Sequence, residues 1–267
     1  MITAGIDIGS TTIKIVIIKD NAIIGSGKTY AGTTPAQTAK NLYNKTLTDS
    51  DITENKIDAI ATTGYGRRLV NFGDIVLTEI RACAIGAAFV LPEILVRTII
   101  DVGGQDTKVI SISEDGEIEG FSMNDKCAAG TGRFLEMLAS RLDMTYEEFV
   151  TAALESFDTL LQMNSTCAVF AESEAIGMLA KGEKKGNIAA AAHHAIASRI
   201  ASMVRRTAVA AENCLFTGGG ALNRALVKAL EEQLGNKILI PQDPQLIVAI
   251  GAALWAARKI QGNTNEN

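Results

Sequence analysis

The chain has 267 residues, a length that suits one large or two small domains. Hydrophobic residues make up 47% of it and charged residues 21%, which is typical of a globular protein with a well-buried core. The net charge of −5 argues against nucleic acid as the main partner, because no basic stripe offsets it. No segment approaches the roughly 18 uncharged apolar residues of a membrane span, so no membrane partner is expected.

The first residues, M-I-T-A-G-I-D, enter a predicted strand at once and lack the shape of a signal peptide. This start predicts a cytoplasmic protein. The chain has four cysteines. In such a protein they are more typical of metal ligands, catalytic groups or core residues than of structural disulfides.

Three strands are predicted at the N-terminus, with a glycine turn between the first two at residues 6–14 (I-D-I-G-S-T-T-I-K). The elements that follow are a helix over residues 34–47, a strand over 57–62, a glycine-punctuated loop over 63–68 and a helix over 78–91.

Residues 99–108 (I-I-D-V-G-G-Q-D-T-K) repeat the first turn. At a single offset (101 − 7 = 94), Asp7 matches Asp101, Gly9 matches Gly103 and Lys14 matches Lys108. A repeat at this spacing indicates two similar domains, and we expect their two Asp-bearing turns to meet across one cleft.

Each of these turns places a carboxylate at the end of an apolar strand, beside small residues that let backbone N–H groups approach an anion. Mg²⁺ bound to nucleotide phosphates takes one or two carboxylates together with phosphate oxygens. One such turn alone is equally compatible with an ordinary hairpin and a solvated aspartate. Two converging turns favour a nucleotide site.

The second half continues with helices over residues 134–141, 145–151, 168–180 and 187–211, a strand over 214–217, a helix from the glycines at 218–220 to about 233, a strand over 237–240 and a closing helix over 245–259. This alternation predicts an α/β protein with layers in both halves. We expect a first domain over residues 1–95 plus the closing helix 245–260, and a second over 96–244.

Residues 217–223 form a third glycine turn, a strand followed by three glycines and a helix start. A flat ring or ribose can lie against such bare backbone, and a helix N-terminus favours anions. No Gly-Lys-Ser/Thr follows, so the turn is not a P-loop. A lone Gly-Gly-Gly is more often a packing turn, but the third glycine turn of a duplicated fold favours nucleotide binding.

The three turns, in this order, resemble those of the superfamily of acetate kinase, sugar kinases, heat-shock ATPases and actin. The resemblance implies duplicated ribonuclease-H-like, actin-like ATPase domains with ATP or ADP and Mg²⁺ in the cleft between them. It implies that Asp7 and Asp101 handle Mg²⁺ and its water, and that Gln105 orients an attacking water near the γ-phosphate. The residues implied in cofactor binding are Gly9, Ser10, Thr11, Thr12, Lys14, Gly103, Gly104, Gly218, Gly219, Gly220 and Asn223.

Cys127 and Cys167 each begin a predicted helix after a polar turn, in N-D-K-C-A-A-G-T-G and N-S-T-C-A-V-F-A-E. The helix dipole and free N–H groups stabilise a thiolate there, which suits metal ligation. A pair of small buried residues is the alternative. A [4Fe–4S] cluster needs four cysteines, which a two-fold dimer contributing two per chain would supply.

Residues 124–136 and 165–174 resemble the ATP-dependent activator (component A) of 2-hydroxyacyl-CoA dehydratases, a family that includes the ATPase subunits of benzoyl-CoA reductase. The match covers essentially the whole chain. It implies a homodimer with one [4Fe–4S] cluster bridging Cys127 and Cys167 of both chains. It further implies that ATP hydrolysis drives one low-potential electron into a partner iron–sulfur dehydratase, with ferredoxin or flavodoxin as the electron donor.

Several alternatives stay open at this point. The chain is alternatively the ATPase subunit of a benzoyl-CoA-type or double-cubane-cluster reductase, a small-molecule kinase of the same superfamily, or an actin-like scaffold. Cys83 stands where relatives usually have His; we favour a neutral core replacement over a change in the coupling between cleft and cluster. Cys214 is expected in the core, and His193 and His194 carry no predicted function.

Overall fold

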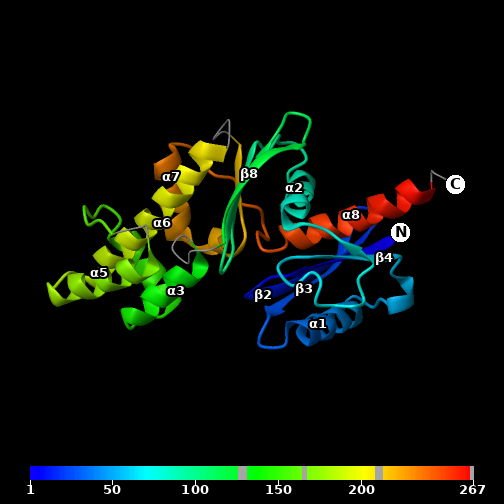
Figure 1. Ribbon diagram of the computed structural model, residues 1–267, viewed down its shortest axis with the longest axis horizontal. Coiled ribbons are helices and arrows are strands. Elements are labelled where there is room, and N and C mark those ends of the chain that lie inside the picture. Colours follow the sequence, from blue (N-terminus) through cyan, green and yellow to red (C-terminus); the bar gives the residue numbers. More distant parts are fainter. Residues whose placement is uncertain (126–130, 164–166, 208–212, 265–267) are drawn as a thin grey trace. The chain divides into compact units, whose positions relative to one another are not determined.

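The computed structural model describes residues 1–125, 131–163, 167–207 and 213–264 (Figure 1). The chain divides into two compact units. Unit 1 comprises Met1–Leu95 and Gln245–Asn267, and unit 2 comprises Val96–Pro244. No helix in the described residues is both long and apolar enough to cross a bilayer.

Unit 1 contains a five-stranded sheet of order β3-β2-β1-β4-β5. Its strands are β1 (Ile2–Ile8), β2 (Thr12–Lys19), β3 (Ala22–Tyr30), β4 (Ala59–Thr63) and β5 (Ile75–Val76). Its helices are α1 (Pro35–Asp49), the 3₁₀ turn η1 (Glu54–Lys56), α2 (Glu79–Val90) and α8 (Ile247–Thr264). β1 pairs antiparallel with β2 and parallel with β4.

Both faces of β1 are covered, which explains its nearly unbroken burial. Ile6 and Ile8 join Leu42 and Tyr43 of α1 in one apolar cluster. On the opposite face, the Thr3 hydroxyl donates a 2.8 Å hydrogen bond to the Ala253 carbonyl of α8. A side chain at Gly5 would overlap the backbone of α8, so glycine permits this close packing.

Unit 2 contains a four-stranded sheet of order β8-β7-β6-β9. Its strands are β6 (Thr98–Val102), β7 (Thr107–Ile112), β8 (Ile118–Asn124) and β9 (Cys214–Thr217). Its helices are α3 (Gly132–Arg141), α4 (Tyr146–Glu155), α5 (Ala168–Ala180), α6 (Lys185–Thr207), the 3₁₀ turn η2 (Gly219–Leu222) and α7 (Arg224–Leu234). One continuous core joins these helices to the sheet, with the alanines of α6 at its centre.

The two sheets repeat the same pairing. Asp7 and Lys14 are cross-strand partners in the β1–β2 ladder, and Asp101 and Lys108 are partners in the β6–β7 ladder. The order β3-β2-β1-β4 in unit 1 corresponds to β8-β7-β6-β9 in unit 2. The predicted α/β class is therefore confirmed, and the repeat seen in the sequence is a repeat of strand topology.

Most predicted elements differ from the structure by a few residues at their ends, but one predicted strand is wrong and one strand was missed. Residues 237–240 do not form a strand, because Leu239 alone among them pairs within the described part of the chain, in an isolated bridge with Leu215. Pro241 follows directly and has no N–H to extend the ladder. The short strand β5 was not predicted, since two residues carry no periodicity.

Candidate functional site

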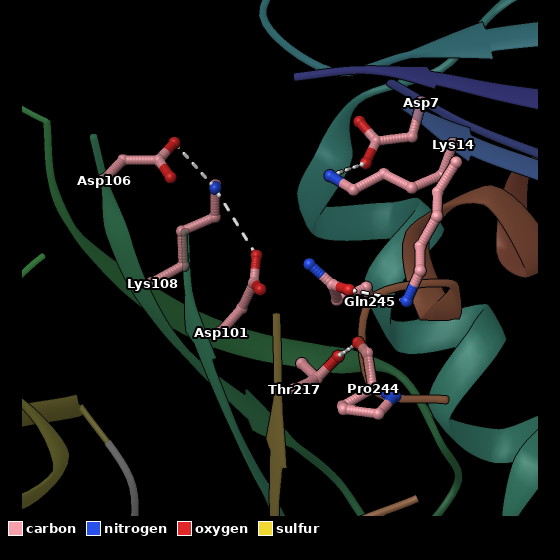
Figure 2. A network of polar contacts seen from close by, with 9 residues as sticks. Asp7, Lys14, Asp101, Asp106, Lys108, Thr217, Pro244 and Gln245 are labelled. Atoms are coloured by element: carbon pink, nitrogen blue, oxygen red, sulfur yellow. Dashed lines mark hydrogen bonds and ion pairs between the residues drawn. The ribbon is translucent and has the colours of Figure 1, made fainter. Parts of the chain in front are cut away.

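The first Asp-bearing turn joins β1 to β2. Asp7 is buried near the end of β1, and the Lys14 ammonium donates a 2.9 Å hydrogen bond to its Oδ2 (Figure 2). The Gly9 amide closes the turn by donating to the Thr12 carbonyl at 3.1 Å. The Thr11 hydroxyl is buried and lacks a hydrogen-bond partner among the described residues.

The second Asp-bearing turn joins β6 to β7. The buried Lys108 ammonium lies 3.5 Å from Asp101 Oδ2 and 2.7 Å from Asp106 Oδ2 (Figure 2). The turn is closed by the Gly103 amide, which donates to the Asp106 carbonyl at 2.9 Å. Gln105 is exposed at the tip of the turn.

Sequence reasoning missed Asp106. At the same offset its counterpart is Thr12 (106 − 94 = 12), so unit 2 places a second carboxylate on its lysine where unit 1 has a hydroxyl. The signal available in the sequence was an Asp two residues before Lys108. The buried Lys108 ammonium needs carboxylate partners, because an unpaired buried charge is strongly destabilising.

The start of α3 packs on the second turn. The amides of Gly132 and Arg133 donate to the carbonyls of Gly103 and Gly104, each at 3.0 Å. Two of the helix's free N–H groups are satisfied in this way. The first turn of α3 is thereby connected to the turn that carries Asp101. The predicted ligand Cys127 lies outside the described residues.

The third glycine turn lies beside Asp101 in unit 2. Gly218 has φ +81°, and a Cβ there would lie 2.5 Å from Asp101 Oδ1. The preceding Thr217 hydroxyl and the Gly218 amide both donate to the Pro244 carbonyl, at 2.5 and 2.9 Å. Only a residue without a side chain lets the Asp101 carboxylate approach this backbone.

Asn223 is buried at the N-cap of α7, and its side chain is fully used within unit 2. Its Oδ1 accepts from the Leu226 amide at 2.9 Å, while its Nδ2 donates to the Tyr146 hydroxyl at 2.8 Å and to His193 Nε2 at 3.0 Å. We interpret Asn223 as the residue that fixes the end of the glycine turn. Direct contact with a nucleotide stays a prediction.

His193 of α6 was assigned no role from the sequence, yet it lies at the centre of this network. Its Nδ1 is 2.7 Å from the Ala189 carbonyl, which can only accept, so Nδ1 carries the proton and Nε2 accepts from Asn223. Burial lowers the pKa of His193 to about 4, which keeps the ring neutral. A histidine in an alanine-rich helix gave no signal for this contact.

The cysteines occupy contrasting environments. Cys167 is half-buried at the N-cap of α5, as predicted, and its carbonyl accepts from the Ala171 amide at 3.0 Å. Cys83 and Cys214 are fully buried, and burial raises the pKa of Cys214 to about 12. A helix N-terminus suits a metal-bound thiolate, whereas the apolar site of Cys214 opposes one.

Large apolar side chains of unit 2 are exposed on and before α5. They are Leu160, Val169, Phe170 and Ile176, the last three of which lie on the outward face of α5. Several exposed apolar side chains on one helix are typical of an interaction surface.

The residues fit a nucleotide and its metal. Two paired carboxylates offer the oxygen ligands that Mg²⁺ prefers, and two lysines supply the positive charge that phosphates need. The buried Thr11 hydroxyl in the first turn also leaves a hydrogen bond to be made. The individual contacts to phosphate and adenosine, and the meeting of the two turns across one cleft, stay predictions.

The chain is similar over nearly its whole length to two dehydratase activators. The chain is 40% identical over 260 residues to a 2-hydroxyisocaproyl-CoA dehydratase activator of Clostridioides difficile, covering 96% of this chain and 95% of that protein. It is 39% identical over 259 residues to the (R)-2-hydroxyglutaryl-CoA dehydratase activating ATPase of Acidaminococcus fermentans, covering 96% and 97%.

Solved structures agree with these relatives. The activator of the 2-hydroxyisocaproyl-CoA dehydratase from Clostridium difficile with bound ADPNP has a TM-score of 0.90 at 36% identity, over 100% of this chain and 98% of that one. A ROK family glucokinase from Streptomyces griseus, at 13% identity and a TM-score of 0.59 over 97% and 100% of the two chains, shares the fold alone. The actin-like ATPase fold predicted from the sequence is thus confirmed.

The family model matches residues 4–256, a span that includes all three glycine turns and both cysteine segments. The chain therefore belongs to the BadF/BadG/BcrA/BcrD ATPase family.

Proposed function

We propose that this protein is an ATP-hydrolysing activator that delivers one low-potential electron to a partner 2-hydroxyacyl-CoA dehydratase. The observation that carries the proposal is the accessible cysteine at the start of α5 in a chain with duplicated Asp–Lys turns. A kinase needs the turns but not the cysteine. The relatives named as dehydratase activators support the same reading.

In this proposal Asp7 and Asp101 hold Mg²⁺ and its water, and Lys14 and Lys108 offset the charge of the phosphates. Hydrolysis of a phosphoryl group depends mainly on positioning and electrostatic stabilisation, which buried paired charges provide. The exposed Gln105 amide orients the attacking water. The glycines at 218–220 lie against the adenosine.

The metal centre is proposed as one [4Fe–4S] cluster shared by a homodimer and held by Cys127 and Cys167 of both chains. When bound, such a cluster supplies a one-electron redox centre. Cys167 fits as a ligand because it lies at a helix start and is not enclosed by the core. The exposed apolar face of α5 supports an interface between two copies beside it.

The partner is proposed as an iron–sulfur dehydratase component, with ferredoxin or flavodoxin as the donor, in the cytoplasm. The two activators compared above are named for different 2-hydroxyacyl-CoA substrates. We therefore propose the class of partner and no single substrate.

The first experiment is to measure iron per polypeptide and the native mass of protein purified without oxygen. About two irons per chain in a dimer would support one shared cluster. About four per chain would overturn the shared cluster, because each subunit would then hold its own. No iron, even after reconstitution with iron and sulfide, would contradict the activator and favour a small-molecule kinase.

A matched pair of variants separates the cluster from the ATPase. Cys167→Ser should abolish electron delivery while ATP hydrolysis continues, because the substitution removes a proposed ligand and leaves the turns intact. Cys83→Ala changes a fully buried cysteine of α2 and should keep both activities. Equal electron delivery by Cys167→Ser and wild type would refute the assignment.

A further inference from the structure

The turn after β4 in unit 1 has the same construction as the turn after β9 in unit 2. Thr63 is the parallel-ladder partner of Asp7, and Thr217 is the partner of Asp101. The residue after each threonine is a glycine with positive φ, +90° at Gly64 and +81° at Gly218. The sequence predicts a glycine-punctuated loop for the first of these segments.

The two glycines also make the same close approach. A Cβ on Gly64 would lie 2.6 Å from Asp7 Oδ1, and a Cβ on Gly218 would lie 2.5 Å from Asp101 Oδ1. Each unit therefore places a buried carboxylate against bare glycine backbone, with a threonine hydroxyl on the adjoining strand. The turn after β4 is thus a second copy of the geometry seen at Gly218, and it lies beside Asp7.

The threonine hydroxyls differ in one respect. Thr217 donates to the Pro244 carbonyl at 2.5 Å (Figure 2). The Thr63 residue is 0% exposed, and its hydroxyl has no hydrogen-bond partner in the described part of the chain. Leaving a buried hydroxyl without a partner costs free energy, so such a group calls for an explanation, and a ligand that supplies the missing bond is one.

The backbone around Thr63 is held firmly, so the missing partner is not explained by a loosely built loop. The Gly66 amide donates to the Ile8 carbonyl at 2.8 Å, and Arg67 Nη1 donates to the Gly64 carbonyl at 3.0 Å. The neighbouring Thr62 hydroxyl donates to the Arg67 carbonyl at 2.8 Å. Thr62 is satisfied by the fold, and Thr63 is not.

A second hydroxyl supports the same conclusion. Thr11 Oγ1, in the β1–β2 turn, is also buried and lacks a partner among the described residues. The two segments that adjoin Asp7, one following it in the chain and one beside it in the sheet, thus each leave a hydroxyl to be satisfied. Both belong to unit 1.

We propose that Thr63 is a further binding residue of the nucleotide site. Its hydroxyl makes its hydrogen bond to an oxygen of the hydrated magnesium–phosphate group that Asp7 and its turn accommodate. The inference rests on the proposed ATPase function and adds the turn after β4, with Gly64 as the residue that admits the Asp7 carboxylate, to the phosphate end of that site.

Measurements of stability and of nucleotide binding on Thr63→Val test the proposed role of the hydroxyl. The substitution keeps the shape and removes the hydroxyl, so the nucleotide-free protein should be as stable toward urea as wild type, or more so, because an unsatisfied group is lost. The dissociation constant for a magnesium-bound, non-hydrolysable ATP analogue should rise about tenfold or more, as expected for a lost bond to a charged group. Binding of adenosine, which lacks phosphates, should not change.

Two further variants serve as controls. Thr63→Ser keeps a hydroxyl and should bind the magnesium-bound analogue within about twofold of wild type. Thr3→Val removes another buried strand hydroxyl of unit 1, one that already donates to the Ala253 carbonyl, so it should lower stability and leave nucleotide binding unchanged.

The outcomes separate the two proposals. If wild type binds the analogue and Thr63→Val binds it equally well, the role of Thr63 is refuted and the ATPase proposal stands. If Thr63→Val loses stability in the free protein with unchanged binding, the hydroxyl is structural. If wild type binds no nucleotide at all, both proposals fail.

Discussion

At the scale of single residues, the third glycine turn depends on side chains far from it in sequence. Asn223 ends that turn, and it is held by Tyr146 of α4 and His193 of α6. His193 can accept from Asn223 only while its ring is neutral, since a protonated ring has two donors and no acceptor. The position of the turn is therefore coupled to the protonation of one histidine.

This coupling predicts a pH dependence of stability. The pKa of His193 is about 4 in the folded protein and about 6.5 when the chain unfolds, so protonation favours the unfolded state. The stabilisation that depends on a neutral His193 is fully present above pH 6.5 and is lost as the pH falls toward 4. The free energy of unfolding should fall by about 3 kcal/mol over this range. Urea unfolding at several pH values should show this loss.

His193→Leu provides the comparison. At pH 7 it should lower the free energy of unfolding by about 1–3 kcal/mol, because Asn223 loses an acceptor. The gap between variant and wild type should close as the pH approaches 4. Parallel pH profiles for the two proteins would contradict the assignment, since carboxylates elsewhere titrate equally in both.

Gly64 yields a second prediction at this scale. Gly64→Ala should lower the free energy of unfolding by more than about 2 kcal/mol, because it adds left-handed strain and a Cβ 2.5 Å from the Ile8 carbonyl oxygen. Gly32→Ala is the matched control, with φ +63° and nothing within 4 Å of the added Cβ. It should cost about 1 kcal/mol. If the two variants lose the same free energy of unfolding in urea, the close approach of Gly64 to Ile8 and Asp7 does not matter for stability.

At the scale of elements, two exposed apolar surfaces of unit 2 compete as interfaces. One is the outward face of α5, which carries Phe170 at 62% exposure next to the Cys167 end of the helix. The other is the edge strand β8, which carries Phe121 at 57%. The proposed shared cluster requires the α5 face, because a two-fold interface must include the cysteine it contributes.

If the proposed dimer forms through α5, Phe170→Glu should shift it toward monomer in sedimentation equilibrium, with a dissociation constant at least tenfold higher, because the charge must be desolvated at the contact. Phe121→Glu should leave the dimer intact. Dissociation by Phe121→Glu and not by Phe170→Glu would place the interface on β8 and contradict a cluster shared at α5.

At the scale of the whole molecule, much of the fold was predictable because the chain repeats itself. The apolar strands that end in Asp7 and Asp101, each followed by small residues and a lysine, are local patterns, and both fold into the same ladder register. The helix start at Cys167 is also local, since it needs only a polar turn and an apolar run. These features depend on neighbours in sequence.

What the sequence could not predict depends on partners that are distant in the chain. Asn223 contacts His193 across 30 residues and Tyr146 across 77, so no local pattern could predict that its side chain holds the turn in place. The strand expected near Leu239 failed because its pairing is limited to one bridge to β9. That the described residues leave the Thr63 hydroxyl without a hydrogen-bond partner is a result of packing, which no residue pattern indicates.

The chain returns to unit 1 at α8, and this order of segments determines which unit can finish folding first during synthesis. Thr3 and Gly5 pack against residues 249–253 of α8, which are synthesised after all of unit 2. One face of the first sheet therefore stays uncovered until the ribosome has made the end of the chain. At about 5–20 residues per second this exposure lasts on the order of 10 s or longer. Unit 2 is continuous and can fold during that interval, whereas unit 1 keeps one face of its sheet exposed until its last helix has been made.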